Sequence, residues 1–136
     1  GKMYRFYGDG MMVNDCYMEE EDGRYALYDK NGIRTYVSTG WYLNKETDGD
    51  VWYYFQNGRP YTGNVGAYYV QDGRMVTGMF AGYMYDNDGR LVTNRWVYLS
   101  NKWYYAGNTG KIYKGTCYVN GKAYLFDQNG AMIKAL

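Results

Sequence analysis

Short runs of aromatic residues alternate with polar stretches that end in glycine along the whole chain. The clearest runs are Trp52–Phe55 and Trp103–Tyr105, and a glycine follows each within a few residues, at Gly58 and Gly110. Asn-Gly and Asp-Gly pairs at such places favour the positive φ that tight hairpin turns need. No segment keeps a helical periodicity, because glycine interrupts each one within about three turns. The pattern therefore predicts an all-β chain built from hairpins.

Seven glycines mark the turns of this pattern. Six of the seven follow Asn or Asp, and Met, Leu, Ile or Pro stands two residues after most of them. The turn glycines are Gly10, Gly32, Gly58, Gly73, Gly89, Gly110 and Gly130. They are 15 to 26 residues apart, a spacing typical of a repeated two-stranded unit. The expected hairpins span residues 2–14, 24–40, 51–63, 67–78, 83–94, 102–115 and 122–134.

An isolated two-stranded hairpin is only marginally stable in water, so these units must bury their apolar faces on one another. We therefore expect a solenoid of about seven stacked β-hairpins that occupies residues 1–136 as a single repeat array. A meander closed into a barrel is the competing architecture, because short strands with regular turns suit it as well. The recurrence of one sequence frame from unit to unit favours the solenoid. We also expect the chain to be a fragment of a longer protein.

The composition narrows the class of protein. Of 136 residues, 20 are tyrosine and 19 glycine, with one proline, no histidine and a mean hydropathy of −0.65. The high aromatic content excludes a disordered chain, and the single proline excludes a collagen. The formal net charge of +1 provides no field that would attract nucleic acid or an anionic membrane surface.

Candidate catalytic chemistry is sparse. Histidine, the commonest general base and zinc ligand, is missing, so Ser38 and Ser100 have no such partner to activate them. Cys16 and Cys117 stand 101 positions apart, which is not the spacing of a zinc or redox motif. The acidic residues fall at expected turns and loop tips, and the run Glu19–Asp22 is interpreted as a solvated loop. We therefore expect no enzymatic activity, no cofactor, no metal site and no insertion into a membrane.

Two segments carry a resemblance to a known family. The first contains Thr39-Gly40-Trp41, Val51–Phe55, Asn57-Gly58 and Thr62-Gly63, and the second contains Arg95-Trp96, Lys102–Tyr105, Gly110, Ile112 and Gly115. With the repeated frame across essentially the whole chain, these segments resemble the cell-wall-binding repeat family. That family includes choline-binding modules of bacterial surface proteins and wall hydrolases, and the related glucan-binding repeats. The resemblance implies a left-handed stack of hairpins with shallow pockets at the seams between units.

In the choline-binding members each pocket is an aromatic box, made by two tryptophans together with an aromatic residue and a methionine of the following unit. The resemblance therefore implies ligand-binding roles for nine residues. One box would use Trp41 and Trp52 with Tyr68 or Tyr69 and Met75, and a second would use Trp96 and Trp103 with Tyr124 and Met132. Only these two units keep both tryptophans. Packing between hairpins is the alternative role for the same side chains.

The rings of such a box suit two kinds of ligand. Their faces attract a quaternary ammonium group, and they also stack on the apolar C–H patches of a sugar. We therefore expect a non-catalytic module that anchors a secreted or surface bacterial protein to a cell-wall polymer, to choline or to a glycan. A structural stalk or protein-interaction repeat with ligand-free pockets is the alternative. Exposed end hairpins, with Phe126 and Met132 at the C-terminal end, would allow a homo-oligomer to form.

Overall fold

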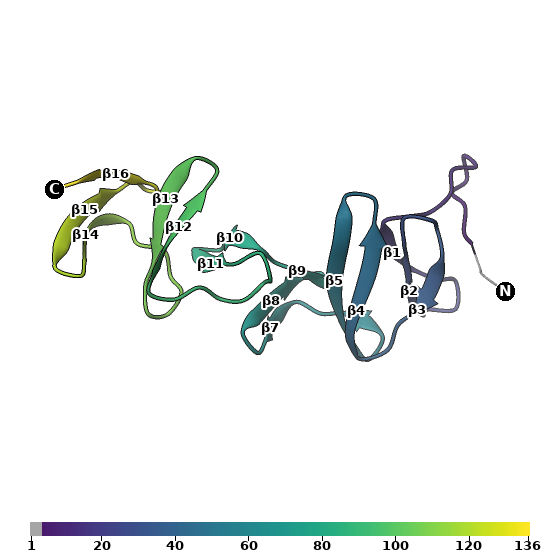
Figure 1. Cartoon of the computed structure of the whole chain (residues 1–136). Coiled ribbons are helices and arrows are strands. Elements are labelled where there is room, and N and C mark those ends of the chain that lie inside the picture. The colour runs from purple at the N-terminus through teal and green to yellow at the C-terminus, as the bar shows by residue number, and fades with distance from the viewer. Residues whose placement is uncertain (1–3) are drawn as a thin grey trace. The chain divides into compact units, whose positions relative to one another are not determined.

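The computed structural model describes residues 4–136, which form β-strands, turns and loops (Figure 1). The strands lie in small, open, antiparallel sheets, so the predicted all-β architecture of repeated hairpins is confirmed. The chain divides into two compact units, Gly1–Met75 and Val76–Leu136. The expected hairpin over 2–14 begins with two residues that lie outside the described part of the chain. Among residues 4–136 there is no helix with the length and apolarity needed to cross a bilayer.

The first unit contains two sheets. Its strands are β1 (Cys16–Glu19), β2 (Tyr25–Tyr28), β3 (Arg34–Tyr36), β4 (Gly40–Glu46), β5 (Gly49–Gln56), β6 (Arg59–Pro60), β7 (Gly63–Val65), β8 (Tyr68–Gln71) and β9 (Arg74–Met75). One sheet has the order β1-β2-β3, and the other has the order β4-β5-β9-β8-β7, with β6 also paired with β5. Before β1, an isolated bridge joins Phe6 and Met12 across the turn at Gly10.

The second unit contains three sheets. Its strands are β10 (Gly78–Phe80), β11 (Tyr83–Tyr85), β12 (Arg95–Leu99), β13 (Lys102–Ala106), β14 (Gly115–Val119), β15 (Lys122–Phe126) and β16 (Met132–Ala135). The sheets are β10-β11, β12-β13 and β14-β15-β16. Isolated bridges extend the first two across the glycine turns, and they join Tyr85 to Leu91 and Ala106 to Ile112.

Each repeat pairs its central strand on both sides. In the last sheet, β15 pairs with β14 before it and with β16 after the turn at Gly130. The expected range 122–134 covers only the second pairing, because the turn glycines follow the central strand. The pairing that precedes the central strand crosses a different turn, such as the one between β12 and β13. There Ser100 and Asn101 both have positive φ, of 52° and 66°, without a glycine between the strands.

The apolar clusters lie between successive hairpins rather than at one common centre. In the first unit, Leu27 of β2 packs with Tyr53 and Phe55 of β5. In the second unit, Tyr105 of β13 packs with Phe126 of β15. Within each unit, every such hairpin therefore buries its apolar face on a neighbour, as expected for a stack of repeats.

Turn glycines provide the closest approach between successive hairpins. A Cβ atom added at Gly110 would overlap the side chain of Leu91, and one added at Gly130 would overlap Ile112. Each of these apolar residues stands two positions after the preceding turn glycine. In the first unit, a Cβ atom added at Gly32 would overlap the side chain of Met12, and one added at Gly73 would lie 3.3 Å from Cβ of Pro60. At these four turns the apolar residue of the sequence frame therefore lies against the space that the next turn glycine leaves open, whereas Gly58 meets the backbone carbonyl of Val37 instead.

The C-terminal hairpin corrects one expectation about exposed residues. Phe126 is buried, with 2% of its surface exposed, and Met132 is half-buried against the same cluster. The exposed apolar side chains of this hairpin are Tyr118, Ile133 and Leu136 instead. The reason is that Phe126 faces back onto the preceding hairpin, whereas Tyr118 pairs with Ala123 and therefore points from the opposite face of the hairpin.

We predict that Gly130→Ala destabilises the second unit more than Gly121→Ala does. Both glycines have positive φ, of 91° and 82°, so both substitutions carry a similar backbone strain. Only the Cβ at position 130 meets Ile112, and overpacking of this kind costs about 1–3 kcal/mol. Urea unfolding followed through the NMR signals of residues 76–136 measures the difference. Equal losses of stability in the two variants would contradict the proposed contact.

Candidate ligand-binding site

The first ring cluster lies on one face of the β4–β5 hairpin. Trp41 pairs with Tyr54 and Leu43 pairs with Trp52, so the alternation of side chains along a strand places these four on the same face. The ring centroid of Trp41 lies 6.5 Å from that of Trp52 and 5.2 Å from that of Tyr54. Tyr68 of β8 completes the cluster from the following hairpin, 5.5 Å from Trp41.

The second ring cluster repeats this arrangement on the β12–β13 hairpin. Trp96 pairs with Tyr105 and Tyr98 pairs with Trp103, which again places the four side chains on one face. The centroid of Trp96 lies 6.5 Å from Trp103 and 5.3 Å from Tyr105. Tyr124 of β15 approaches Trp96 to 5.0 Å.

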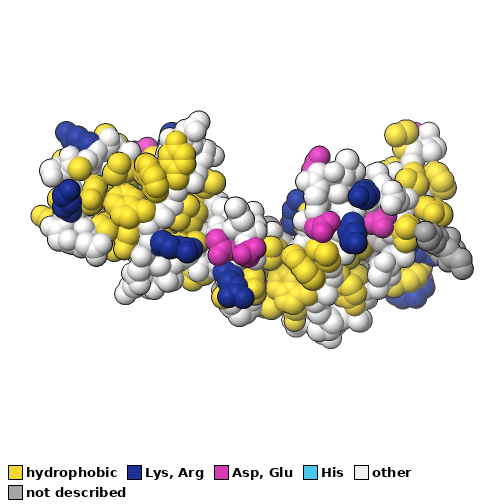
Figure 2. All heavy atoms as spheres, in the orientation of Figure 1, with side chains coloured by type: hydrophobic (Ala, Val, Ile, Leu, Met, Phe, Trp, Pro, Cys, Tyr) yellow, Lys and Arg dark blue, Asp and Glu magenta, His cyan; other side chains and the backbone are white. Residues whose placement is uncertain are grey.

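The two clusters share their geometry as well as their members. The tryptophan planes meet at 88° in the first cluster and at 84° in the second. Trp52 and Trp103 are the outer rings, with 42% and 44% of their surfaces exposed, whereas Trp41 and Trp96 are half-buried. Figure 2 shows hydrophobic side chains gathered on the visible face of each unit. Each cluster therefore presents one accessible indole beside a more deeply packed one.

Three further residues were predicted to belong to the sites, namely Met132, Met75 and Tyr69. Met132 packs against the apolar cluster that also contains Trp96 and Tyr124. Met75 lies in β9 and pairs with Val70. Tyr69 follows Tyr68 in β8, so its side chain leaves the strand on the opposite face. Of the two tyrosines predicted as alternatives, Tyr68 is the one seated against Trp41.

Several ring partners are missing from the set predicted from the sequence. Tyr54 and Tyr105 lie directly across from the inner tryptophans, and Tyr98 is 5.0 Å from Trp103. Phe126 stacks on Trp96 at 5.8 Å, with 29° between the ring planes. The period-two alternation of a strand would have identified Tyr54 and Tyr105, because each stands two residues after an outer tryptophan.

A third ring cluster in the first unit contains tyrosine and phenylalanine but no tryptophan. The centroid of Tyr17 lies 6.1 Å from Tyr25, 6.0 Å from Tyr53 and 5.7 Å from Phe55. The guanidinium group of Arg59, in β6, lies 6.0 Å from the centroid of the Tyr25 ring. This seam therefore already holds a cation of the protein itself at one of its ring faces.

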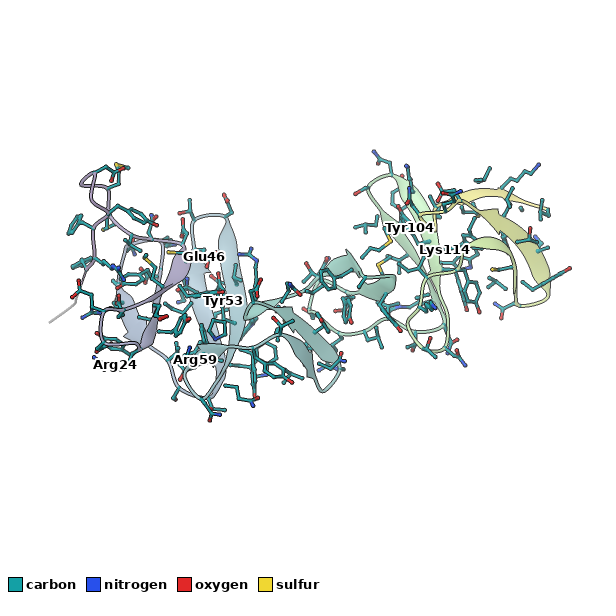
Figure 3. The ribbon with its side chains drawn as sticks, turned by 180° about the vertical axis from the view of Figure 1, so that it is seen from behind. Arg24, Glu46, Tyr53, Arg59, Tyr104 and Lys114 are labelled. Atoms are coloured by element: carbon teal, nitrogen blue, oxygen red, sulfur yellow. The ribbon has the colours of Figure 1, made fainter. Side chains whose placement is uncertain are left out.

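A buried carboxylate supports the β4–β5 hairpin from the face opposite the tryptophans. Glu46 accepts a hydrogen bond of 2.6 Å from the Tyr53 hydroxyl and one of 2.9 Å from the Asn44 amide (Figure 3). Asn44 also donates to the backbone carbonyl of Tyr28, which ties β4 to β2. Arg74 lies 3.6 Å from the second carboxylate oxygen. Burial, followed by the hydrogen bond to Glu46, raises the pKa of the Tyr53 phenol far above its usual value.

Potential metal ligands are not grouped together in the described part of the chain. Within residues 4–136, no group of three or more His, Cys, Asp or Glu side chains is arranged to hold a metal ion. Several carboxylates already accept backbone hydrogen bonds in turns, such as Asp86 and Asp127. The chemistry that the clusters offer is therefore that of aromatic ring faces.

The chain is similar to known proteins in sequence and in fold. The chain matches no protein-family profile. Glucosyltransferase-I of Streptococcus mutans serotype c is 28% identical over 145 residues, an alignment that takes in 93% of this chain. The chain spans only 9% of the length of that relative.

Two solved structures from Streptococcus pneumoniae share the fold. CbpJ has a TM-score of 0.57 and 24% identity, over 95% of this chain and 48% of that one. The modular autolysin LytC, solved with a synthetic peptidoglycan ligand, has a TM-score of 0.52 and 18% identity, over 97% of this chain and 36% of that one. The resemblance to the cell-wall-binding repeat family is confirmed. The repeat fold is shared with these proteins, while the ligand in the LytC structure is a property of LytC.

We predict that the free energy of unfolding falls as the pH rises above about 10, and that Tyr53→Phe weakens this dependence. A raised folded-state pKa means that the native protein holds the phenol proton more tightly than the unfolded chain does. The stability gained in this way is complete below the ordinary tyrosine pKa and is lost as the pH rises past it. Urea unfolding at about pH 8 and about pH 11 measures the loss.

Some dependence will persist in the Tyr53→Phe variant, because burial also raises the pKa of Tyr17 and Tyr28. At neutral pH the variant loses one donor to buried Glu46, which costs about 1–3 kcal/mol. Tyr118→Phe, at an exposed ring, is the matched control. The same pH dependence in the wild type and in Tyr53→Phe would rule out a contribution from this phenol.

Proposed function

We propose that the chain is a non-catalytic binding module that anchors a secreted or surface bacterial protein to a cell-wall polymer or glycan. The observation that carries this proposal is the repetition of one ring geometry in both units. Trp41 with Trp52, and Trp96 with Trp103, have the same centroid separation of 6.5 Å and nearly the same angle. Packing alone does not require an exposed tryptophan at the same hairpin position twice.

The exposed indoles carry the binding chemistry. The face of Trp52 or Trp103 attracts a quaternary ammonium group such as choline, with about 0.5–2 kcal/mol for each ring. The same face also stacks on the C–H patch of a sugar ring. In both cases the half-buried inner tryptophan lies beside the outer ring, and the tyrosine of the next hairpin packs against the inner tryptophan. The ligand class is therefore choline or a sugar unit of a wall polymer.

A repeated ligand suits a protein with repeated sites. One ring cluster gives only modest affinity, but two clusters on one chain raise the effective concentration of a polymer that has already bound once. The likeness in fold to LytC, which was solved with a synthetic peptidoglycan ligand, supports a wall polymer as the partner. The likeness in sequence to a streptococcal glucosyltransferase supports a glucan as the alternative polymer, and both likenesses support a location outside the cell or on its surface.

A non-catalytic role agrees with the missing histidine and with the hydrogen bonds that the buried carboxylates already make. The sequence has no histidine, and the buried carboxylates Glu20 and Glu46 are already occupied by arginine, tyrosine or asparagine donors. An acid–base pair needs a carboxylate within reach of a substrate proton. The parent protein would supply any catalysis from other parts of its chain.

A structural stalk is the second candidate, and one observation favours it. Trp96 stacks on Phe126, a core residue, so at least one tryptophan of the second cluster contributes directly to packing. In a stalk, the outer tryptophans would contribute apolar contact but no ligand affinity. The two candidates therefore differ in what removal of Trp52 or Trp103 does to binding.

We predict that Trp52→Ala and Trp103→Ala each lower the affinity for the ligand by about 2- to 30-fold while the chain stays folded. Titration of tryptophan fluorescence with choline, with wall polysaccharide and with α-glucan measures the affinity of the whole chain. Tyr118→Ala, which removes an exposed ring outside both clusters, is the control and keeps the wild-type affinity. No response of the folded wild type to any of the three ligands would leave the stalk as the function.

A further inference from the structure

A polar cavity of about 390 Å³ opens in the first unit. None of the tryptophans lines it. The side chains that matter for its chemistry are those of Tyr4, Arg5, Glu20, Glu21, Arg34 and Tyr36. Its volume lies within the range of small-molecule sites, which is about 300–1,000 Å³. The cavity combines aromatic rings with charged hydrogen-bond donors and acceptors.

Glu20 organises the floor of this cavity. Only 8% of its side chain is exposed, although its position in an acidic run predicts a solvated loop. One carboxylate oxygen accepts a hydrogen bond from the Tyr28 hydroxyl and lies 3.3 Å from Arg34 Nη1, and the other accepts from Arg5 Nη1. A guanidinium group has five N–H donors, so both arginines keep further donors after this pairing. The contacts with Glu20 hold both guanidinium groups at the cavity.

Tyr36 provides a wall whose orientation is fixed. The guanidinium carbon of Arg24 lies 3.8 Å from the centroid of its ring, and that of Arg34 lies 4.8 Å away. The ring is nevertheless 37% exposed. A second tyrosine, Tyr4, is 47% exposed and lines the same cavity. The two guanidinium groups cover part of the Tyr36 ring, and the exposed parts of Tyr36 and Tyr4 are the apolar surface that remains open to a ligand.

The charges around the cavity cancel. Arg5 and Arg34 line the cavity together with Glu20, Glu21 and Asp22, and Arg24, which lies outside the lining, neutralises Asp22 in an ion pair of 2.7 Å. The three positive and three negative groups leave no net charge to select an anion or a cation. A neutral ligand with hydroxyl groups and an apolar C–H face matches the donors, the acceptors and the rings together. We propose that this cavity binds one neutral hexose unit of a glycan.

No tryptophan lines this cavity, so binding in the cavity and binding at the tryptophan clusters can be lost independently of each other. The test uses the whole chain, with ¹⁵N-labelled protein titrated with isomaltotriose and, separately, with glucuronic acid. Signals of Tyr36 and of the Arg34 side chain report on the cavity. The four tryptophan indole signals report on the ring clusters.

We expect isomaltotriose to shift the Tyr36 and Arg34 signals with a saturable dependence, and glucuronic acid to bind more weakly. Tyr36→Leu should weaken the isomaltotriose response about tenfold, because the stacking surface is lost. Tyr118→Leu, a matched change at an exposed tyrosine of the other unit, should leave it unchanged. An unchanged indole spectrum with shifts at Tyr36 would support this site alone. No shift at Tyr36 or Arg34, an equal response in Tyr36→Leu, or a preference for glucuronic acid would overturn the proposal.

Discussion

The stack depends on the close approach between a turn glycine and the apolar side chain that follows the preceding turn. At Gly130 the chain carries no Cβ, and Ile112 of the hairpin before it fills that space. Because both backbones turn at this point, the contact fixes how closely the two hairpins pack. At that separation Tyr124 reaches Trp96, with 5.0 Å between the ring centroids. The ring cluster therefore follows from the way the turns pack, and the ligand site that we propose lies at the same seam.

The hairpin architecture could be predicted from the sequence because its signals are local. Aromatic runs followed by Asn-Gly or Asp-Gly specify strands and turns within a few residues. The pairing of each central strand with the strand before it was harder to predict. Between β12 and β13, for example, Ser100 and Asn101 have positive φ although neither is a glycine. Whether neighbouring units stack depends on contacts across about twenty residues, and only the repeated apolar residue after each turn hinted at them.

The candidate sites also differ in whether their residues lie close together in the sequence. The two tryptophan pairs and Tyr124 could be predicted through the resemblance to a known repeat family, because each pair belongs to one hairpin and Tyr124 follows from the repeat frame in the next. Tyr105 was missed, although strand alternation places it beside Trp96. The cavity around Glu20 could not be foreseen, because its partners Arg5 and Arg34 are 15 and 14 residues away along the chain. A sequence shows an acidic run there, and only the fold shows that one member of it is buried among arginines.

A double-mutant cycle between Leu91 and Gly110 tests the glycine contact most directly. Gly110→Ala is introduced into the wild type and into Leu91→Ala, and the free energy of unfolding is followed through the NMR signals of residues 76–136. If the two residues pack as described, Gly110→Ala costs less when Leu91 has been truncated, with a coupling of about 0.5–3 kcal/mol. Costs that add to within about 0.5 kcal/mol would contradict the account.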